Sequence, residues 1–497
     1  MMMTKEKEFL NAQTQFSTLL SLVTQAVADG QRIDQVERGL FTGLLQLGLT
    51  LLKAFVAGHG DGDVGSTLTD KDGQTWKRLP EKHTRRYVSV FGVLPAIERV
   101  VYGTRERQRI AAVPLDQRLG LPANDFSYLL EDWVQRLCVK ESFEEAGESL
   151  ATLLGLSLGV RTLETMNQGL AAHADRFRDQ QLPPAVEEEG SILVATADGK
   201  GVPMRRPLEE RVRRSHRRTK GEKATKKQMA YVGAVYSIAP FIRVAQDVVD
   251  DVFRKERAAD RPKPQHKRVR AEMTELLEGE DGAEQTRNGR DTLFAELSDA
   301  VVLRQRQARR SGKKLLLVCL LDGERALWDK RLEYLPWSIG ILDIFHVLER
   351  LWLAAHVWHA EKSPLAEAFV AERLRMLLEG KLSQLLAGLR RRLKTHPVSA
   401  AKQRTVQGVI GYLQNNRAYM KYHEYLAEGY PIGSGVVEGA CRHLVKDRME
   451  QTGMRWTVPG AQAMLDTRAL YLNGDWNAFC HHRIEQEQTE LYGHMAA

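Results

Sequence analysis

The chain has 497 residues, too many for one hydrophobic core, so we expect two to four domains. Hydrophobic residues make up 43% of the chain and charged residues 27%, which is ordinary for a soluble globular protein. The net charge of +8 favours an anionic partner, and nucleic acid is the leading candidate.

Cysteine spacing and hydropathy exclude further classes. The four cysteines form no CxxC pair, which argues against a zinc ribbon or a disulfide framework. The charged N-terminus predicts no signal peptide, and no window approaches the roughly 20 apolar residues of a membrane span. No internal repeat or heptad pattern is evident. We therefore expect a cytoplasmic protein.

The first part of the chain is predicted to be mostly helical. Residues 1–135 contain two helices in 1–57, from their three- and four-residue apolar spacing, and a short hairpin in 85–103. Two helices joined by a glycine-containing turn in 141–170 make residues 136–185 a helix-turn-helix candidate, although a plain helical hairpin has the same pattern. The Pro- and Glu-rich segment 181–190 is the best domain boundary.

After this boundary, strands alternate with helices. Strands are predicted at 192–197 and 228–238, with 201–206 as the start of a hairpin partner to the first. The Arg- and Lys-rich run 209–227 between them is either a solvated arm or a phosphate contact, and 254–292 is expected to be a mobile insertion. A helix at 294–310 and two more strands follow. This order predicts a mixed α/β sheet.

Two of the predicted strands end in Asp-Gly, at Asp198 in "ATADGKG" and at Asp322 in "CLLDGER". A single Asp-Gly indicates a turn, whereas two after apolar runs indicate neighbouring carboxylates at one sheet edge. Glu438 follows the glycine-rich "PIGSG" loop and is the best third acid. Three oxygen ligands suit Mg²⁺ or Mn²⁺, and a pair of such ions can catalyse phosphodiester chemistry.

Five stretches resemble the bacterial insertion-sequence transposases of the ISKra family, distant relatives of the Mutator-like transposases. They span roughly residues 190–480 and are "TADGKGVPMR", "LDGERALW", "ILDIFHVLERLW", "YPIGSGVVEGACRHLVKDRMEQTGMRWT" and "GAQAMLDTRALYLNGDW". The resemblance implies an RNase H-like fold with a DDE triad. Asp198, Asp322 and Glu438 match its first, second and third acids and would hold the Mg²⁺ or Mn²⁺ ions.

The resemblance also implies a domain order. An RNase H-like catalytic core begins in 186–346, continues after an all-helical insertion at 347–430, and is completed by 431–497, which holds the third acid and C-terminal helices. An independent helical domain would give the same pattern in 347–430. The helix-turn-helix candidate becomes the reader of transposon ends. Many relatives carry a cysteine cluster upstream of it, whereas this chain has only Cys138, so zinc is not expected there.

"LDIFHV" resembles the (C/D)xxH signature of Mutator-like transposases, through Asp343 and His346. Asp343 also ends a predicted strand, so it competes with Asp322 for the place of second acid. His346 has an alternative role as a packed core histidine at the head of a helix.

Basic residues near the acids are candidate DNA contacts. Two of them, Arg442 and Lys446, lie four and eight residues after Glu438 and would share its helical face. Trp456, next to a cation, suits stacking on DNA, although a buried anchor for the last helix is the commoner role. The full candidate set is Arg205, Arg206, Arg442, Lys446, Arg455 and Trp456.

The predicted function is that of a DNA transposase that hydrolyses DNA at the element's terminal inverted repeats and joins the freed 3′-hydroxyl to target DNA. Two ends must be held together, so we expect a homodimer or larger assembly in a bacterial, nucleoid-associated setting. The alternatives are a domesticated, non-catalytic DNA-binding regulator and a related nuclease without strand transfer.

Overall fold

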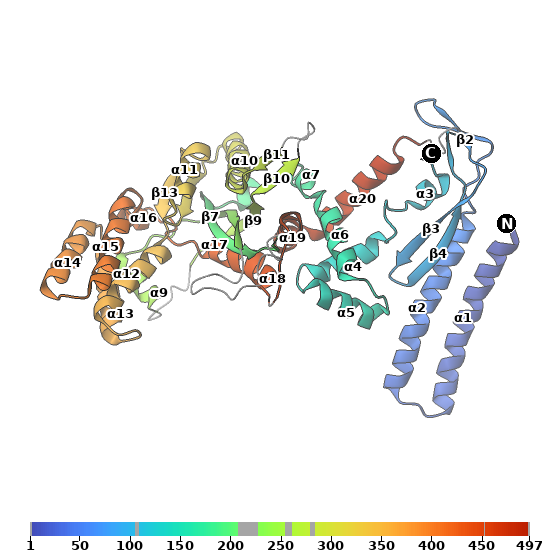
Figure 1. Ribbon diagram of the computed structural model, residues 1–497, viewed down its shortest axis with the longest axis horizontal. Coiled ribbons are helices and arrows are strands. Elements are labelled where there is room, and N and C mark those ends of the chain that lie inside the picture. Colours follow the sequence, from blue (N-terminus) through green and yellow to red (C-terminus); the bar gives the residue numbers. More distant parts are fainter. Residues whose placement is uncertain are drawn as a thin grey trace. The chain divides into compact units, whose positions relative to one another are not determined.

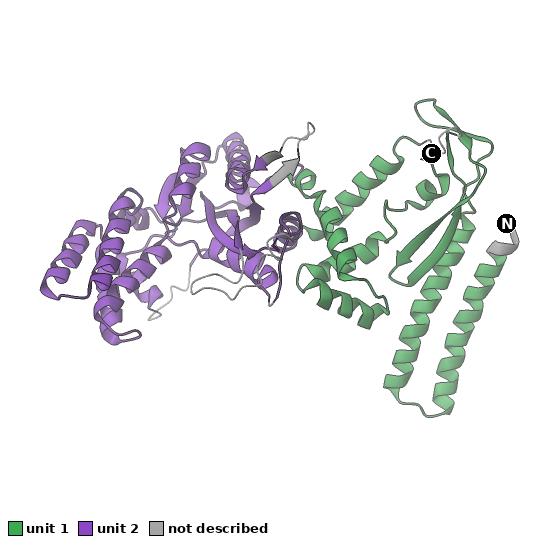
Figure 2. Ribbon diagram, viewed as in Figure 1, with its two compact units in different colours: residues 1–178, 475–497 green, residues 179–474 purple. Residues whose placement is uncertain are grey.

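The chain divides into two compact units, unit 1 with residues 1–178 and 475–497 and unit 2 with residues 179–474 (Figure 2). This computed structural model describes residues 2–104, 109–206, 227–253, 261–278, 284–451 and 453–495. The passage between the units at residue 179 lies beside the predicted boundary at 181–190. The C-terminal segment 475–497 was expected to complete the catalytic core, but it belongs to unit 1.

Unit 1 joins helices to two small antiparallel sheets (Figure 1). The helices expected in residues 1–57 are present. The predicted hairpin is present as β3–β4, but strands of three or four residues form a second sheet, β1-β2-β5-β6, that hydrophobic patterning did not reveal. The strands are β1 (Thr67–Thr69), β2 (Thr75–Arg78), β3 (His83–Ser89), β4 (Gly92–Arg99), β5 (Tyr102–Thr104) and β6 (Arg109–Ala112).

The helices of unit 1 are α1 (Met2–Ala28), α2 (Ile33–Gly58), α3 (Pro114–Leu119), α4 (Tyr128–Cys138), α5 (Phe143–Leu154), α6 (Val160–Ala171), α7 (Ala174–Asp179) and α20 (Trp476–Tyr492). Among the described residues, α2 is the one helix long and apolar enough to cross a bilayer by length and composition. The prediction that no window approaches a membrane span is therefore wrong for α2.

Helices α5 and α6 occupy the predicted helix-turn-helix position. Ser142 and Glu145 form a capping box at the start of α5, and Gly155 ends it with φ 67°, in the left-handed region. Helix α4 packs on both, and the three share a core that includes Leu130, Val134, Leu150 and Leu163. A three-helix arrangement is compatible with a helix-turn-helix module and is more than an isolated helical hairpin.

Unit 2 is built on a five-stranded mixed sheet in the order β13-β12-β7-β8-β9. Strands β7, β12 and β13 are parallel, whereas β8 is antiparallel to both β7 and β9. The strands are β7 (Ile192–Pro203), β8 (Lys227–Ile238), β9 (Gln265–Met273), β12 (Leu316–Leu321) and β13 (Ile339–Leu342). A separate hairpin joins β10 (Glu275–Glu278) to β11 (Glu284–Arg287).

Two sequence predictions about this sheet are wrong. Strand β7 runs through Asp198 and Gly199 without a turn, and pairs with β8 over its whole length, so 201–206 do not begin its hairpin partner. The expected mobile insertion at 254–292 contains β9, an edge strand, and the β10–β11 hairpin. Strand β9 was not predicted because its sequence is rich in charged residues. In the structure these charges are compatible with a strand, since Arg270 is paired with the buried Glu272. Residues 254–260 and 279–283, and the basic run up to 226, lie outside the described residues.

Helices cover both faces of the sheet. Gly233 faces Leu293 and Leu297 of α10 (Gly289–Arg310), and its register partner is Ala197. Successive side chains alternate between the faces of a strand, so Asp198 points to the opposite face. On that face, α17 (Gly435–Ala440) and the π-helical turn η3 (Cys441–Lys446) pack against β7.

The predicted helical insertion is present between β13 and α17. It shares one continuous hydrophobic cluster with the sheet, so it is not an independent domain. Its helices are α12 (Ile344–Trp358), α13 (Pro364–Leu378), α14 (Leu382–Thr395), α15 (Ala400–Asn415), η2 (Arg417–Tyr419) and α16 (Tyr422–Ala427). The remaining helices of unit 2 are η1 (Val186–Glu188), α9 (Ala245–Val252), α11 (Arg325–Tyr334), α18 (Asp447–Met449) and α19 (Val458–Leu472).

Candidate active site

Three aspartates stand in a row across the parallel strands of unit 2. Leu321 of β12 is in register with Ala197 of β7 and with Leu342 of β13. The next residue along each strand is an aspartate, namely Asp198, Asp322 and Asp343. Neighbouring strands lie about 4.8 Å apart, so the register alone brings the three residues together, as the sequence predicted for Asp198 and Asp322.

Asp343 is fully buried and both of its carboxylate oxygens are engaged. Oδ1 accepts a hydrogen bond from the backbone N–H of Phe345 at 2.9 Å, which caps α12, and Oδ2 accepts one from the hydroxyl of Ser434. The side chain therefore anchors the start of α12 to the loop before α17. This role makes Asp343 the weaker candidate for the second acid.

Asp322 is only partly buried and is the better candidate. It follows β12 directly, and its Oδ1 accepts a hydrogen bond from the backbone N–H of Glu324 at 2.7 Å. The indole N–H of Trp328 donates to the Asp322 carbonyl at 2.7 Å. One face of the turn is thus fixed, while the second carboxylate oxygen of Asp322 forms no hydrogen bond with another described residue.

Glu438 is exposed on α17 and belongs to the same charged cluster. Although Glu438 is exposed by its surface area, partial desolvation beside the sheet raises its pKa, and the negative charges of Asp343 and Asp198 raise it further. Burial likewise raises the pKa of Asp322, with additional contributions from Asp198 and Asp343. His346 contributes a smaller, opposite effect on both carboxyl groups, so its ring lies near them.

His346 lies in the first turn of α12 and is partly exposed, with its Nδ1 3.7 Å from Oε2 of Glu349. A packed core histidine would be buried, so the alternative role considered from the sequence is not observed. Its ring instead stands at the edge of the acidic cluster, near Asp322 and Glu438.

Cys441 is a site residue that the sequence analysis did not single out. Its Sγ lies 3.5 Å from Oδ2 of Asp198, at the start of the π-helical turn. Burial and the charge of Asp198 raise the pKa of Cys441 well above its usual value, so the thiol stays protonated and donates. Ser434 was missed as well, although both lie within the glycine-rich stretch around Glu438 that could have drawn attention to them.

Most of the predicted basic contacts are exposed. Arg205 follows β7, and its backbone N–H donates to the Trp456 carbonyl at 2.7 Å, which holds the segments carrying Arg205 and Arg455 side by side. Arg442 and Lys446 are exposed on η3, and Arg206 is partly exposed.

Trp456 is buried, which corrects the prediction that its ring stacks on DNA. The guanidinium of Arg448 lies 5.1 Å from the ring centroid, and the indole N–H donates to the Met449 carbonyl at 3.1 Å. The tryptophan anchors the segment before α19, as the alternative from the sequence anticipated.

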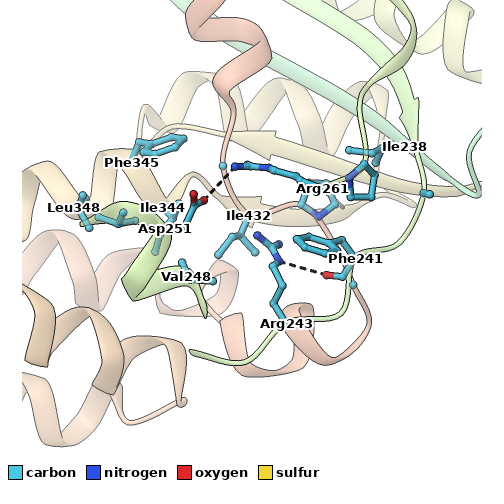
Figure 3. A pocket seen from close by; sticks show the side chains of 16 residues that line it. Ile238, Phe241, Arg243, Val248, Asp251, Arg261, Ile344, Phe345, Leu348 and Ile432 are labelled. Carbon is cyan, nitrogen blue, oxygen red and sulfur yellow. Dashed lines mark hydrogen bonds and ion pairs between the residues drawn. The ribbon is translucent and has the colours of Figure 1, made fainter. Parts of the chain in front are cut away.

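A cavity of about 350 Å³ lies beside the start of α12, and none of the four acids of the cluster lines it (Figure 3). Ile344, Phe345 and Ile432 give it apolar walls. Figure 3 shows two arginines at its rim, Arg243, which donates to the Phe241 carbonyl, and Arg261, which is paired with Asp251 at 3.1 Å.

The donor chemistry of the cluster fits a divalent cation, but the side chains are not preassembled around one. Among the described residues, no lysine or arginine forms an ion pair with Asp198, Asp322, Asp343 or Glu438. The same part of the chain contains no group of three or more His, Cys, Asp or Glu arranged to hold a metal ion. A bound divalent cation would offset the repulsion that helps to raise the pKa values of Asp322 and Glu438.

Comparison with known proteins adds no relative: neither a protein-family model nor a curated protein matches the chain. Inference about function therefore rests on the geometry of the acidic cluster and on the resemblance described above.

Proposed function

We propose that the chain is a DDE transposase in which Asp198, Asp322 and Glu438 direct metal-dependent phosphoryl transfer on DNA. The observation that carries the proposal is the sheet register that aligns Asp198 with Asp322, beside a helix that bears Glu438. The mixed sheet, with three parallel strands and two antiparallel pairings, is compatible with the RNase H-like core that the resemblance implies.

Each residue has a distinct part in this proposal. Asp198, Asp322 and Glu438 would hold Mg²⁺ or Mn²⁺, which supplies charge stabilisation and an activated oxygen nucleophile for phosphodiester cleavage and joining. The Cys441 thiol orients Asp198, and the Glu324 backbone N–H orients Asp322. His346, the histidine of the "LDIFHV" signature, lies at the edge of the cluster. Arg205, Arg442 and Lys446 are exposed and would bind phosphates.

The exposure of Glu438 indicates how the site is completed. Because Glu438 lies on a short helix that passes into a π-helical turn, and such turns are frequent at functional sites, we expect α17 to adjust when cations and DNA bind. The domesticated regulator and the nuclease remain the alternatives, and both are outcomes of the test.

The test uses the full chain, Mg²⁺ and labelled DNA from the flanks of its gene. We expect cleaved and joined products, and a loss of at least about 100-fold in cleavage for Asp198→Asn, Asp322→Asn and Glu438→Gln, with DNA binding retained. Asp329→Asn, on the exposed face of α11, is the matched control and should cleave normally. Cleavage without joining would favour the nuclease, and binding without cleavage by the unmutated chain would favour the regulator.

A further inference from the structure

Helices α1 and α2 form an antiparallel hairpin with a seam of its own. Leu19 lies against Gly43 and Leu22 against Gly39, so residue numbers increase along α1 as they decrease along α2, as expected for antiparallel helices. The hydroxyl of Thr50 donates to Gln15 at 2.5 Å across the same seam. These contacts use one face of each helix, and the other faces of α1 and α2 take no part in the packing of the two helices against each other.

Each helix carries a second apolar stripe that is exposed. On both helices the stripe advances in steps of three and four residues or their sum, the heptad spacing of paired helices. No heptad pattern was evident in the sequence because the apolar residues of the buried seam and of the exposed stripe are interspersed along each helix. The two sets can be told apart only by their exposure in the structure. The stripe residues, each between 38% and 78% exposed, are Phe9, Phe16, Leu20, Val23 and Val27 of α1 and Phe41, Leu44, Leu51 and Phe55 of α2.

The two stripes lie on one face of the hairpin. At about 100° per residue, the α1 stripe lies roughly a quarter turn from its seam and the α2 stripe roughly a third of a turn, both in the same rotational sense. In an antiparallel pair, equal rotational sense places both stripes on the same side. We call the nine side chains together the hairpin face.

The area of the hairpin face is that of a stable interface. About half of each side chain is open, which for residues of this size amounts to on the order of 800 Å² of apolar surface in total. Monomeric proteins rarely leave contiguous apolar patches much above a few hundred Å² uncovered. A standard stable protein–protein interface takes about 800 Å² from each partner.

A lipid bilayer is the competing occupant, and the composition of the hairpin argues against it. The charge-free run of α2 from Gly39 to Leu52 is about 21 Å long, short of the roughly 30 Å of a bilayer core. Gln46 is exposed within that run, and α1 presents exposed Ser and Thr along its length.

We propose that the hairpin face docks on the same face of a second copy of this chain, so that two hairpins form a four-helix bundle. The hairpin face contains no residue of the acidic cluster and needs no DNA, so a failed test of the dimer would leave the proposed function untouched.

The full chain should have the mass of a dimer in light scattering at micromolar concentration. Leu20→Glu with Leu44→Glu, in the centre of the hairpin face, should shift the mass to that of a monomer, because two charges per copy would be buried. The matched control, Ser21→Glu with Thr42→Glu, adds the same charges at exposed positions away from the face and should remain dimeric.

A cross-linking experiment covers the case in which the charged variant misfolds. Leu20→Cys should give disulfide-linked dimers on oxidation, and Ser21→Cys should give far fewer. A monomeric wild-type chain, or a dimer that survives Leu20→Glu with Leu44→Glu, would overturn the proposal. So would a monomer that binds vesicles of neutral and anionic phospholipid through the hairpin face.

Discussion

At the scale of single residues, the site depends on carboxylates that repel one another. Asp322 is partly buried beside Asp198 and Asp343, and burial together with their charges raises its pKa. The folded chain therefore holds the Asp322 proton more tightly than the unfolded chain does. The resulting stabilisation is complete below the ordinary pKa of about 4 and is lost as the pH rises through the raised value.

Removing this charge should stabilise the protein at neutral pH. We expect Asp322→Asn to raise Tm at pH 7 by a few degrees, because the amide oxygen still accepts from the Glu324 N–H while the repulsion disappears. The difference from wild type should vanish near pH 4. Thermal unfolding between pH 4 and 8 measures it, with Asp329→Asn as the control. A lower Tm for Asp322→Asn at pH 7 would show that the charge is compensated in the folded chain.

The residues of the site were predictable to different degrees. Asp198 and Asp322 could be found because an aspartate after an apolar run is visible in a single chain and sheet register aligns such residues. The anchoring role of Asp343 could not be found, because it depends on a hydrogen bond from Ser434, which is remote in sequence. The burial of Trp456 depends equally on Arg448 packing over its ring.

At the scale of elements, long helices and apolar strands could be predicted, and charged or short strands could not. Strand β9 alternates buried Val269, Ala271 and Met273 with charged residues. Its charges are satisfied by partners such as Glu272 with Arg270, which a composition-based prediction does not consider. The turn expected after Asp198 was wrong because β8, on the far side of the basic run, supplies the pairing strand.

The α4–α6 module gives a prediction at this scale. Helix α5 begins with acidic residues, whereas α6 exposes Arg161, Thr165 and Gln168, so α6 is the better candidate for base contacts. Arg161→Glu with Gln168→Glu should weaken binding to element-end DNA at least about tenfold, at unchanged Tm.

Gel-shift titration at fixed salt measures this affinity, because the electrostatic part of DNA binding depends strongly on ionic strength. Arg390→Glu, exposed on α14 in unit 2, is the control for a general loss of positive charge. Equal weakening by the control would mean that α6 has no special part in binding.

At the scale of the whole molecule, unit 1 is assembled from two distant parts of the chain. Arg483 of α20 forms an ion pair with Glu131 of α4 at 2.6 Å, and Glu487 lies 3.3 Å from the same guanidinium. All three side chains are buried. Removal of one partner from such a buried group leaves an uncompensated charge.

Arg483→Ala should therefore destabilise unit 1 by about 3 kcal/mol. Arg176, which pairs with Glu490 at the exposed surface, offers the comparison, and Arg176→Ala should cost at most about 1 kcal/mol. Urea unfolding followed by circular dichroism measures both. Equal small losses would mean that water reaches the Glu131 carboxylate and replaces the guanidinium.

The division of unit 1 between the two sides of unit 2 also sets an order of events during synthesis. Unit 2 is continuous, so it has all of its strands before α20 is made, whereas Glu131 stays without Arg483 until residues after 474 have left the ribosome. A chain cut short in unit 2 would leave the Glu131 carboxylate without its cation and α4 without the helix that covers it. Truncated chains should therefore fold poorly and be degraded readily by proteases, so that they would not accumulate.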